Sequence, residues 1–172
     1  MRIIAGTHRG HTIHAPRGRD TRPTSDRVRE NVFNILGPVD GASVLDLYAG
    51  SGAMGLEALS RGAERVVFVE RDADAARTIE RNLDKLHLRA TVLRRDAVAM
   101  LAGETRKYDL VLVDPPYDMY LDVQPQLARY LPHILAEDGV VVVETDARVE
   151  PELPFPQRTS RTYGAARVTV YG

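Results

Sequence analysis

The residues that most clearly suggest chemistry are Asp114, Pro115, Pro116 and Tyr117, which follow a run of apolar residues. Proline lacks a backbone N–H and has a fixed φ, so a Pro-Pro pair leaves carbonyl groups held in place and free to accept. The Asp114 carboxylate is a further acceptor, and the Tyr117 ring can stack on a planar base. Acceptors that hold both hydrogens of an amino group direct its lone pair at an electrophile. These are therefore candidate catalytic residues for transfer to an amine, and the alternative is a strand that ends in a Pro-Pro turn with a core tyrosine.

A second candidate site surrounds Gly50, Gly52 and Gly55, which are spaced Gly-x-Gly-x-x-Gly after another apolar run. Glycines at this spacing permit a tight turn and let a ligand approach the backbone closely. Glu70 follows Gly50 by 20 residues and is placed to accept the two hydroxyls of a ribose. The spacing is shared by nicotinamide-dinucleotide sites, so these features alone fit either a dehydrogenase or a transferase with a nucleoside cofactor. A glycine turn that only packs a helix is the structural alternative.

Two aspartates favour the transferase. Asp46 lies inside the apolar run before the glycines, where dinucleotide sites usually have an apolar residue. A carboxylate in a buried strand needs a partner, and the cationic amino group of an amino-acid ligand would supply one. Asp96 is a candidate acceptor for an adenine amino group, and it is equally suited to be the N-cap of the helix that follows.

These residues must be positioned by strands and helices that alternate along the chain. Apolar runs without polar alternation are typical of parallel strands buried on both faces. The pattern therefore predicts an α/β fold with a mostly parallel sheet of about seven strands that ends in an antiparallel hairpin over 159–172. The expected strands are 44–48, 66–70, 90–94, 109–114 and 139–144. The expected helices are one that begins near Thr24-Ser25-Asp26 and ends at Gly37, then 53–61, 72–87, 97–103 and 119–136.

The composition excludes several classes of protein. The chain has 172 residues, which corresponds to one domain with a small extension, and it has no cysteine. A disulfide scaffold, a thiol nucleophile and a cysteine-ligated cluster are therefore excluded. No run approaches the roughly 18 apolar residues that a membrane span needs, and the N-terminus lacks a signal-peptide core. We therefore expect a cytoplasmic protein.

The net charge of −1 conceals an uneven distribution. Residues 1–25 contain five arginines and one aspartate, or +4, whereas the other 147 residues contain 18 basic and 23 acidic side chains, or −5. This asymmetry is typical of a basic arm that contacts nucleic acid, and a solvated, mobile arm is the alternative. The expected phosphate contacts are Arg9, Arg17, Arg19 and Arg22. His8, His11 and His14 recur at a spacing of three, which does not bring three side chains to one face of an extended segment, so we expect no metal site.

Over nearly its whole length the chain resembles the RsmD family of bacterial methyltransferases, which act on the 2-amino group of a guanine in 16S rRNA. The matching motifs are residues 2–10, 21–34, 44–52, Glu70, Asp96 and residues 114–117. The resemblance implies a Rossmann-like class I fold, a small N-terminal β-rich extension and S-adenosylmethionine as cofactor. It also implies that Asp114 to Tyr117 hold the target guanine. The residues that it assigns to the cofactor are Asp46, Tyr48, Gly50, Gly52, Glu70, Arg71, Asp96, Ala97, Arg22 and Thr24.

The resulting domain prediction is an RNA-binding extension over 1–23 and a methyltransferase domain over 24–172. The expected partner is 16S rRNA or an assembling small ribosomal subunit, and the chain is expected to be a monomer. Three alternatives remain open at this point. They are an amino methyltransferase for adenine in DNA, one for glutamine in a protein, and an RNA-binding assembly factor without activity.

Overall fold

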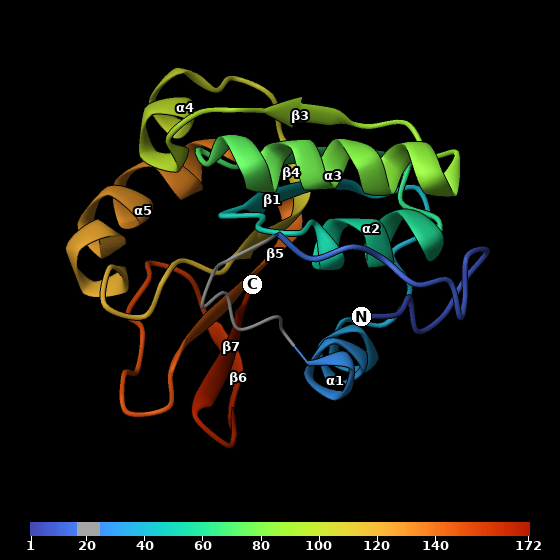
Figure 1. Cartoon of the computed structure of the whole chain (residues 1–172). Coiled ribbons are helices and arrows are strands. Elements are labelled where there is room, and N and C mark those ends of the chain that lie inside the picture. The colour runs from blue at the N-terminus through green and yellow to red at the C-terminus, as the bar shows by residue number, and fades with distance from the viewer. Residues whose placement is uncertain (17–24) are drawn as a thin grey trace.

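The computed structural model describes residues 1–16 and 25–172 of the chain. In this part, seven strands form one sheet in the order β3-β2-β1-β4-β5-β7-β6 (Figure 1). In this order, the first five strands are parallel to one another. Strand β7 runs antiparallel to β5, and β6 pairs antiparallel with β7 to form a C-terminal hairpin. The predicted α/β fold is confirmed. The strands are β1 (Ser43–Leu47), β2 (Arg65–Val69), β3 (Thr91–Leu93), β4 (Tyr108–Val113), β5 (Leu135–Asp146), β6 (Gln157–Tyr163) and β7 (Ala166–Tyr171).

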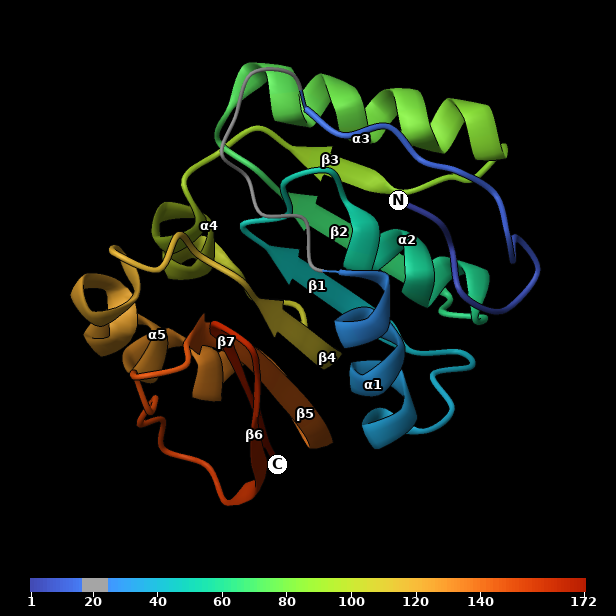
Figure 2. The ribbon, with the colours of Figure 1, turned by 60° about the horizontal axis from the view of Figure 1, so that its bottom comes forward.

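Helices cover both faces of this sheet (Figure 2). They are α1 (Asp26–Leu36), α2 (Ala53–Ser60), α3 (Ala73–Leu86), α4 (Ala97–Gly103) and α5 (Tyr120–Ile134). On one face, Val44 and Leu110 pack with residues of α1, α2 and α3 such as Phe33. On the other face, the next residues along the same strands, Leu45 and Val111, pack with α4 and α5. Successive side chains of a strand point to opposite faces, so strands covered on both sides are apolar throughout.

The predicted start of α4 agrees with the structure, whereas the predicted range of β5 is too short. Asp96 caps α4 by accepting from the N–H of Ala99 at 2.9 Å, so α4 begins where the sequence predicts. Strand β5 extends beyond the predicted 139–144 at both ends. It begins immediately after α5, where Leu135 pairs with Tyr108 across an irregularity in the register. Within the described ranges, no helix is long and apolar enough to cross a membrane.

The N-terminal segment, residues 1–16, lies against α2 and α3 (Figure 2). An antiparallel bridge joins Arg2 to Thr12. The neighbouring side chains of Ile3 and Ile13 are buried in the hydrophobic core, together with residues of the helices. The backbone N–H of His14 donates to Asn82 of α3 at 2.7 Å. The described part of the predicted extension is therefore built into the fold by apolar burial and backbone hydrogen bonds.

Glu57 of α2 is the central anchor of this segment. Its carboxylate is fully buried and accepts from the backbone N–H groups of Ile4 and Ala5 at 2.9 and 3.0 Å. It also accepts from the guanidinium groups of Arg29 and Arg61 at 3.3 and 2.8 Å. One carboxylate thus joins the N-terminal segment, α1 and α2, and its burial is compensated by four donors.

Candidate active site

A cavity of about 1020 Å³ opens at the carboxyl ends of β1, β2, β4 and β5. Ligands of open α/β sheets bind at this edge. The cavity brings together the two sites that the sequence predicts separately, one around the glycines and one after β4. The predicted residues that line it are Asp46, Tyr48, Gly50, Glu70, Arg71, Asp96, Ala97, Asp114, Pro115, Pro116 and Tyr117.

Two other predicted site residues, Gly52 and Arg9, do not line the cavity. Gly52 is absent from the lining, and a Cβ there would lie 3.2 Å from the Ile79 side chain, so this glycine serves the close packing of α2. Arg9 is exposed on the N-terminal segment and does not line the cavity. Four further predicted residues, Arg17, Arg19, Arg22 and Thr24, lie outside the described residues.

Asp46 lies at the base of the cavity. Its side chain is 3% exposed, and its carboxylate accepts from the backbone N–H of Gly55 at 3.0 Å. Burial raises the pKa of Asp46 to about 8, against the opposing effect of the Gly55 hydrogen bond, and the negative charge of Glu70 adds to the rise. A cationic group in the cavity would favour the ionised carboxylate and reverse this shift.

The loop that follows β1 carries Tyr48 in a left-handed conformation, with φ of 57°. Such a backbone is strained in a residue other than glycine and is concentrated at functional sites. The Tyr48 hydroxyl is buried and has no hydrogen-bond partner among residues 1–16 and 25–172. Burial, with the nearby charge of Asp96, raises the pKa of Tyr48 to about 12. The hydroxyl therefore stays neutral at physiological pH.

Gly50 and Glu70 form the next part of the wall. Gly50 has φ of 58°, and a Cβ on it would meet nothing within 4 Å, so the backbone here faces open cavity. Its N–H donates to Glu70 at 2.9 Å, and the other carboxylate oxygen of Glu70 accepts from the N–H of Asp72 at 2.8 Å. Each carboxylate oxygen retains a second acceptor position, which a ribose hydroxyl could use. Glu70 thus fixes the glycine loop and remains able to accept from a ligand.

Asp96 has the capping function that the sequence allows, and its position is compatible with the other. Its side chain caps α4 and also lines the cavity, with Ala97 beside it. An adenine ring in this part of the cavity would lie between this acceptor and the apolar residues around it. The geometry therefore supports the expected adenine contact without requiring Asp96 to give up its structural function.

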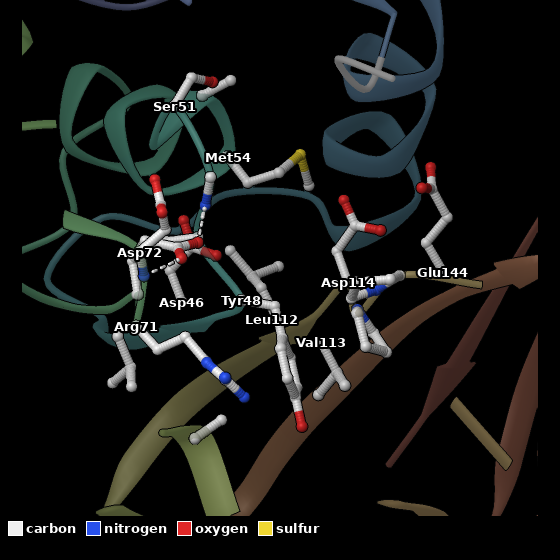
Figure 3. A pocket seen from close by; sticks show the side chains of 18 of the residues that line it. Asp46, Tyr48, Ser51, Met54, Arg71, Asp72, Leu112, Val113, Asp114 and Glu144 are labelled. Atoms are coloured by element: carbon white, nitrogen blue, oxygen red, sulfur yellow. Dashed lines mark hydrogen bonds between the residues drawn. The ribbon is translucent and has the colours of Figure 1, made fainter. Parts of the chain in front are cut away.

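Asp114 and Tyr117 follow the end of β4, and both are half-buried. Of the two prolines between them, Pro115 is buried and Pro116 is exposed. The close-up in Figure 3 shows Asp114 across the cavity from Tyr48 and Arg71, and beside Glu144. Glu144 lines the cavity, and the sequence analysis missed it. It ends an apolar run of β5 just as Asp114 ends that of β4, and this repeated pattern was the available signal.

A sheet in this strand order, with an antiparallel β7 and a cavity of this chemistry, defines a class I methyltransferase. The family model described as "Conserved hypothetical protein 95" matches residues 1–172, and the chain belongs to this family. The predicted resemblance to the RsmD family is thereby confirmed.

Individual relatives agree with this assignment. The chain is 38% identical to "Ribosomal RNA small subunit methyltransferase D" of Escherichia coli K12, over 90% of this chain and 78% of that protein. It is 40% identical to the protein YlbH of Bacillus subtilis, over 99% of this chain and 98% of that one. The solved structure of yhhF from Escherichia coli has a TM-score of 0.86 and 32% identity, and the similarity covers 99% of this chain and 96% of that one.

Proposed function

We propose that this chain transfers a methyl group from S-adenosylmethionine to the 2-amino group of a guanosine in 16S rRNA. The observation that carries the proposal is the single cavity in which a nucleoside-binding wall faces the Asp-Pro-Pro-Tyr motif. The name of the Escherichia coli relative supports small-subunit rRNA as the substrate. The cofactor supplies an activated methyl group on a sulfonium, so the protein needs mainly to position the acceptor.

The first wall of the cavity fits the proposed cofactor. Asp46 would accept from its ammonium group, which explains why a carboxylate with a raised pKa is retained in a buried strand. Glu70 would accept from the ribose hydroxyls, while Asp96 and Ala97 would contact the adenine.

The second wall would hold the target amine. The Asp114 carboxylate and a carbonyl of the Pro-Pro segment would each accept one N–H of the amino group. Tyr117 would stack on the base and keep its plane fixed, a contact worth about 1–3 kcal/mol. With both hydrogens held, the nitrogen lone pair is directed along the line of methyl transfer. Catalysis would then rest on orientation and on acceptors for the positive charge that develops on the nitrogen.

The basic residues near the N-terminus would contact RNA. We propose residues 1–23 as the RNA-binding extension and residues 24–172 as the methyltransferase domain, with Arg9, Arg17, Arg19 and Arg22 at phosphates. We also propose that the protein acts as a monomer. An rRNA substrate would place the protein in the cytoplasm.

Two measurements test the proposed function. Mass mapping of 16S rRNA from a strain without this protein should show one guanosine lacking a 2-amino methyl group, and the cloned gene should restore it. In vitro, the purified protein should transfer labelled methyl groups to small subunits from that strain. Transfer only to DNA or to a protein would refute the rRNA assignment, and RNA binding without transfer would indicate an assembly factor.

A further inference from the structure

Glu144 lies next to Asp114 at the carboxyl edge of the sheet. In the parallel pair β4–β5, Val113 pairs with Val143, so the next residues along both strands are neighbours at the cavity. Alternation along the strands places both carboxylates on the face that α1 and α2 cover, which is also the face of Asp46. Figure 3 shows the two side chains beside each other, with Met54 nearby.

The Glu144 carboxylate is half-buried and lines the cavity. Among the hydrogen bonds and ion pairs between described residues, none involves it. Other shielded carboxylates of this protein have donors close by: Glu57 has Arg29 and Arg61, and Glu104 has Arg106 and Tyr108. Partial burial of a carboxylate without a donor costs free energy, which a ligand that donates would recover.

We propose that Glu144 reads the target base by accepting a hydrogen bond from the ring N1–H of guanine while Asp114 holds the adjacent 2-amino group. This inference rests on the proposed function. Neighbouring strands are about 4.8 Å apart, a spacing that lets two carboxylates approach adjacent donors on one edge of a base. Glu144 is then a specificity-determining residue.

Base chemistry explains the discrimination. In guanine, one of the two ring nitrogens beside the amino group, N1, carries a hydrogen, and the other, N3, is a bare acceptor. In adenine and cytosine, the single ring nitrogen beside the amino group is a bare acceptor. An ionised carboxylate only accepts, so it binds guanine and repels the lone pair of the other two bases. A site built around a specific donor rejects analogues that lack it, because its own polar group is left unpaired.

The test uses 2-aminopurine, which keeps the reactive 2-amino group but has no hydrogen on N1. The guanosine found by mass mapping is replaced with 2-aminopurine riboside in otherwise identical 16S rRNA, and kcat/KM for methyl transfer is measured on reconstituted subunits. Wild-type protein should prefer guanosine by about 10- to 100-fold, the range expected for one hydrogen bond to a charged group. In Glu144→Gln this preference should fall at least tenfold, because an amide can donate to bare N1.

Glu137→Gln is the matched control, since it is the same change at an exposed position near the other end of β5. It should keep the wild-type preference. A lower rate of Glu144→Gln on both substrates with an unchanged preference would overturn the inference, as would equal wild-type rates on the two bases. The wild-type comparison does not depend on the folding of any variant. If wild-type protein methylates no guanosine in rRNA, the proposed function itself fails, which is a distinct result.

Discussion

Asp46 combines a structural cost with a proposed function. Its pKa in the folded protein is about 8, above the ordinary value of 3.8, chiefly because of burial. The folded state therefore binds this proton more tightly than the unfolded state does, and the stabilising effect is lost as the pH rises toward 8. Such a buried acid is tolerated where its ionised form binds a ligand, as proposed here for the ammonium group of the cofactor.

Asp46→Asn should remove this pH dependence while keeping an acceptor for the Gly55 N–H. Relative to wild type, its free energy of unfolding without cofactor should increase progressively between about pH 5 and pH 8.5, by up to about 1.4 kcal/mol per pH unit. Urea unfolding at the two pH values measures the difference. Parallel pH profiles would show that Asp46 is ionised in the free protein.

The raised pKa of Asp46 predicts that this residue changes its protonation state when the cofactor binds. An ammonium beside Asp46 favours the carboxylate, so binding of S-adenosylmethionine near pH 7 should release a proton. Calorimetry in buffers with different ionisation enthalpies measures this release. Asp46→Asn should bind at least about tenfold more weakly and release no proton from this position. Equal proton release by the variant would assign the effect to another group.

Asp114→Asn addresses the proposed amine site. It should lower kcat for methyl transfer by about 100-fold or more, because a strong acceptor for the reacting amine is weakened. Binding of S-adenosylhomocysteine should remain within about twofold of wild type. Asp122→Asn, at an exposed aspartate of α5 away from the cavity, is the control and should retain full activity. Undiminished transfer by Asp114→Asn would remove this residue from the mechanism.

At the scale of elements, the N-terminal segment is fastened to the end of α2. Gly6 has φ of +86°, and a Cβ on it would lie 1.8 Å from the Ser60 carbonyl oxygen. Gly10 has a similar φ of +84°, but a Cβ there would meet nothing within 4 Å. A side chain at Gly10 therefore meets only the cost of a left-handed backbone, whereas a side chain at Gly6 meets that cost and a steric clash as well.

Gly6→Ala should destabilise the protein by about 3 kcal/mol or more, since the segment must move away from α2. Gly10→Ala should cost only about 1–2 kcal/mol, the penalty of a left-handed residue with a Cβ. Urea unfolding of both variants under one condition compares them. Equal losses would mean that the segment shifts without resistance at Gly6.

Helices and strands can be predicted from the sequence where the pattern of apolar residues lies within the segment itself. Contacts between residues far apart in the chain cannot be predicted in this way. The apolar run before Asp114 specifies β4, and the spacing of apolar residues specifies α1, because periodicity is contained within each segment. The same holds for the carboxyl-edge position of Asp96. By contrast, nothing next to Glu57 in the sequence shows that Ile4 and Arg29 are its partners. Glu144 was missed for a related reason, since its relation to Asp114 depends on strand register.

For the whole molecule, charge placement predicts how RNA binding responds to salt. Each lost phosphate contact should reduce the slope of log K against log salt by about 0.7 to 0.9. Arg9→Gln, Arg17→Gln and Arg19→Gln combined should therefore flatten the slope by about 2.1 to 2.7. These substitutions leave buried Ile3 and Ile13 intact, which deletion of the segment would not. Filter binding to small-subunit rRNA across a salt series measures the slope.

Arg77→Gln is the control for this experiment, because Arg77 is exposed on α3 and pairs with Asp74. It should leave the slope unchanged. If the triple variant keeps the wild-type slope, phosphate contacts must come from other basic residues, and the N-terminal segment would be structural.

The anchoring of this segment also sets an order of events during synthesis. Its backbone and side-chain partners Glu57, Ser60, Asn82 and Leu86 lie 52 to 78 residues further along the chain. At a translation rate of about 5–20 residues per second, the first residues leave the ribosome several seconds before α3 is complete. Ile3 and Ile13 cannot be buried in that interval, so docking of the N-terminus is a late step in the folding of a nascent chain.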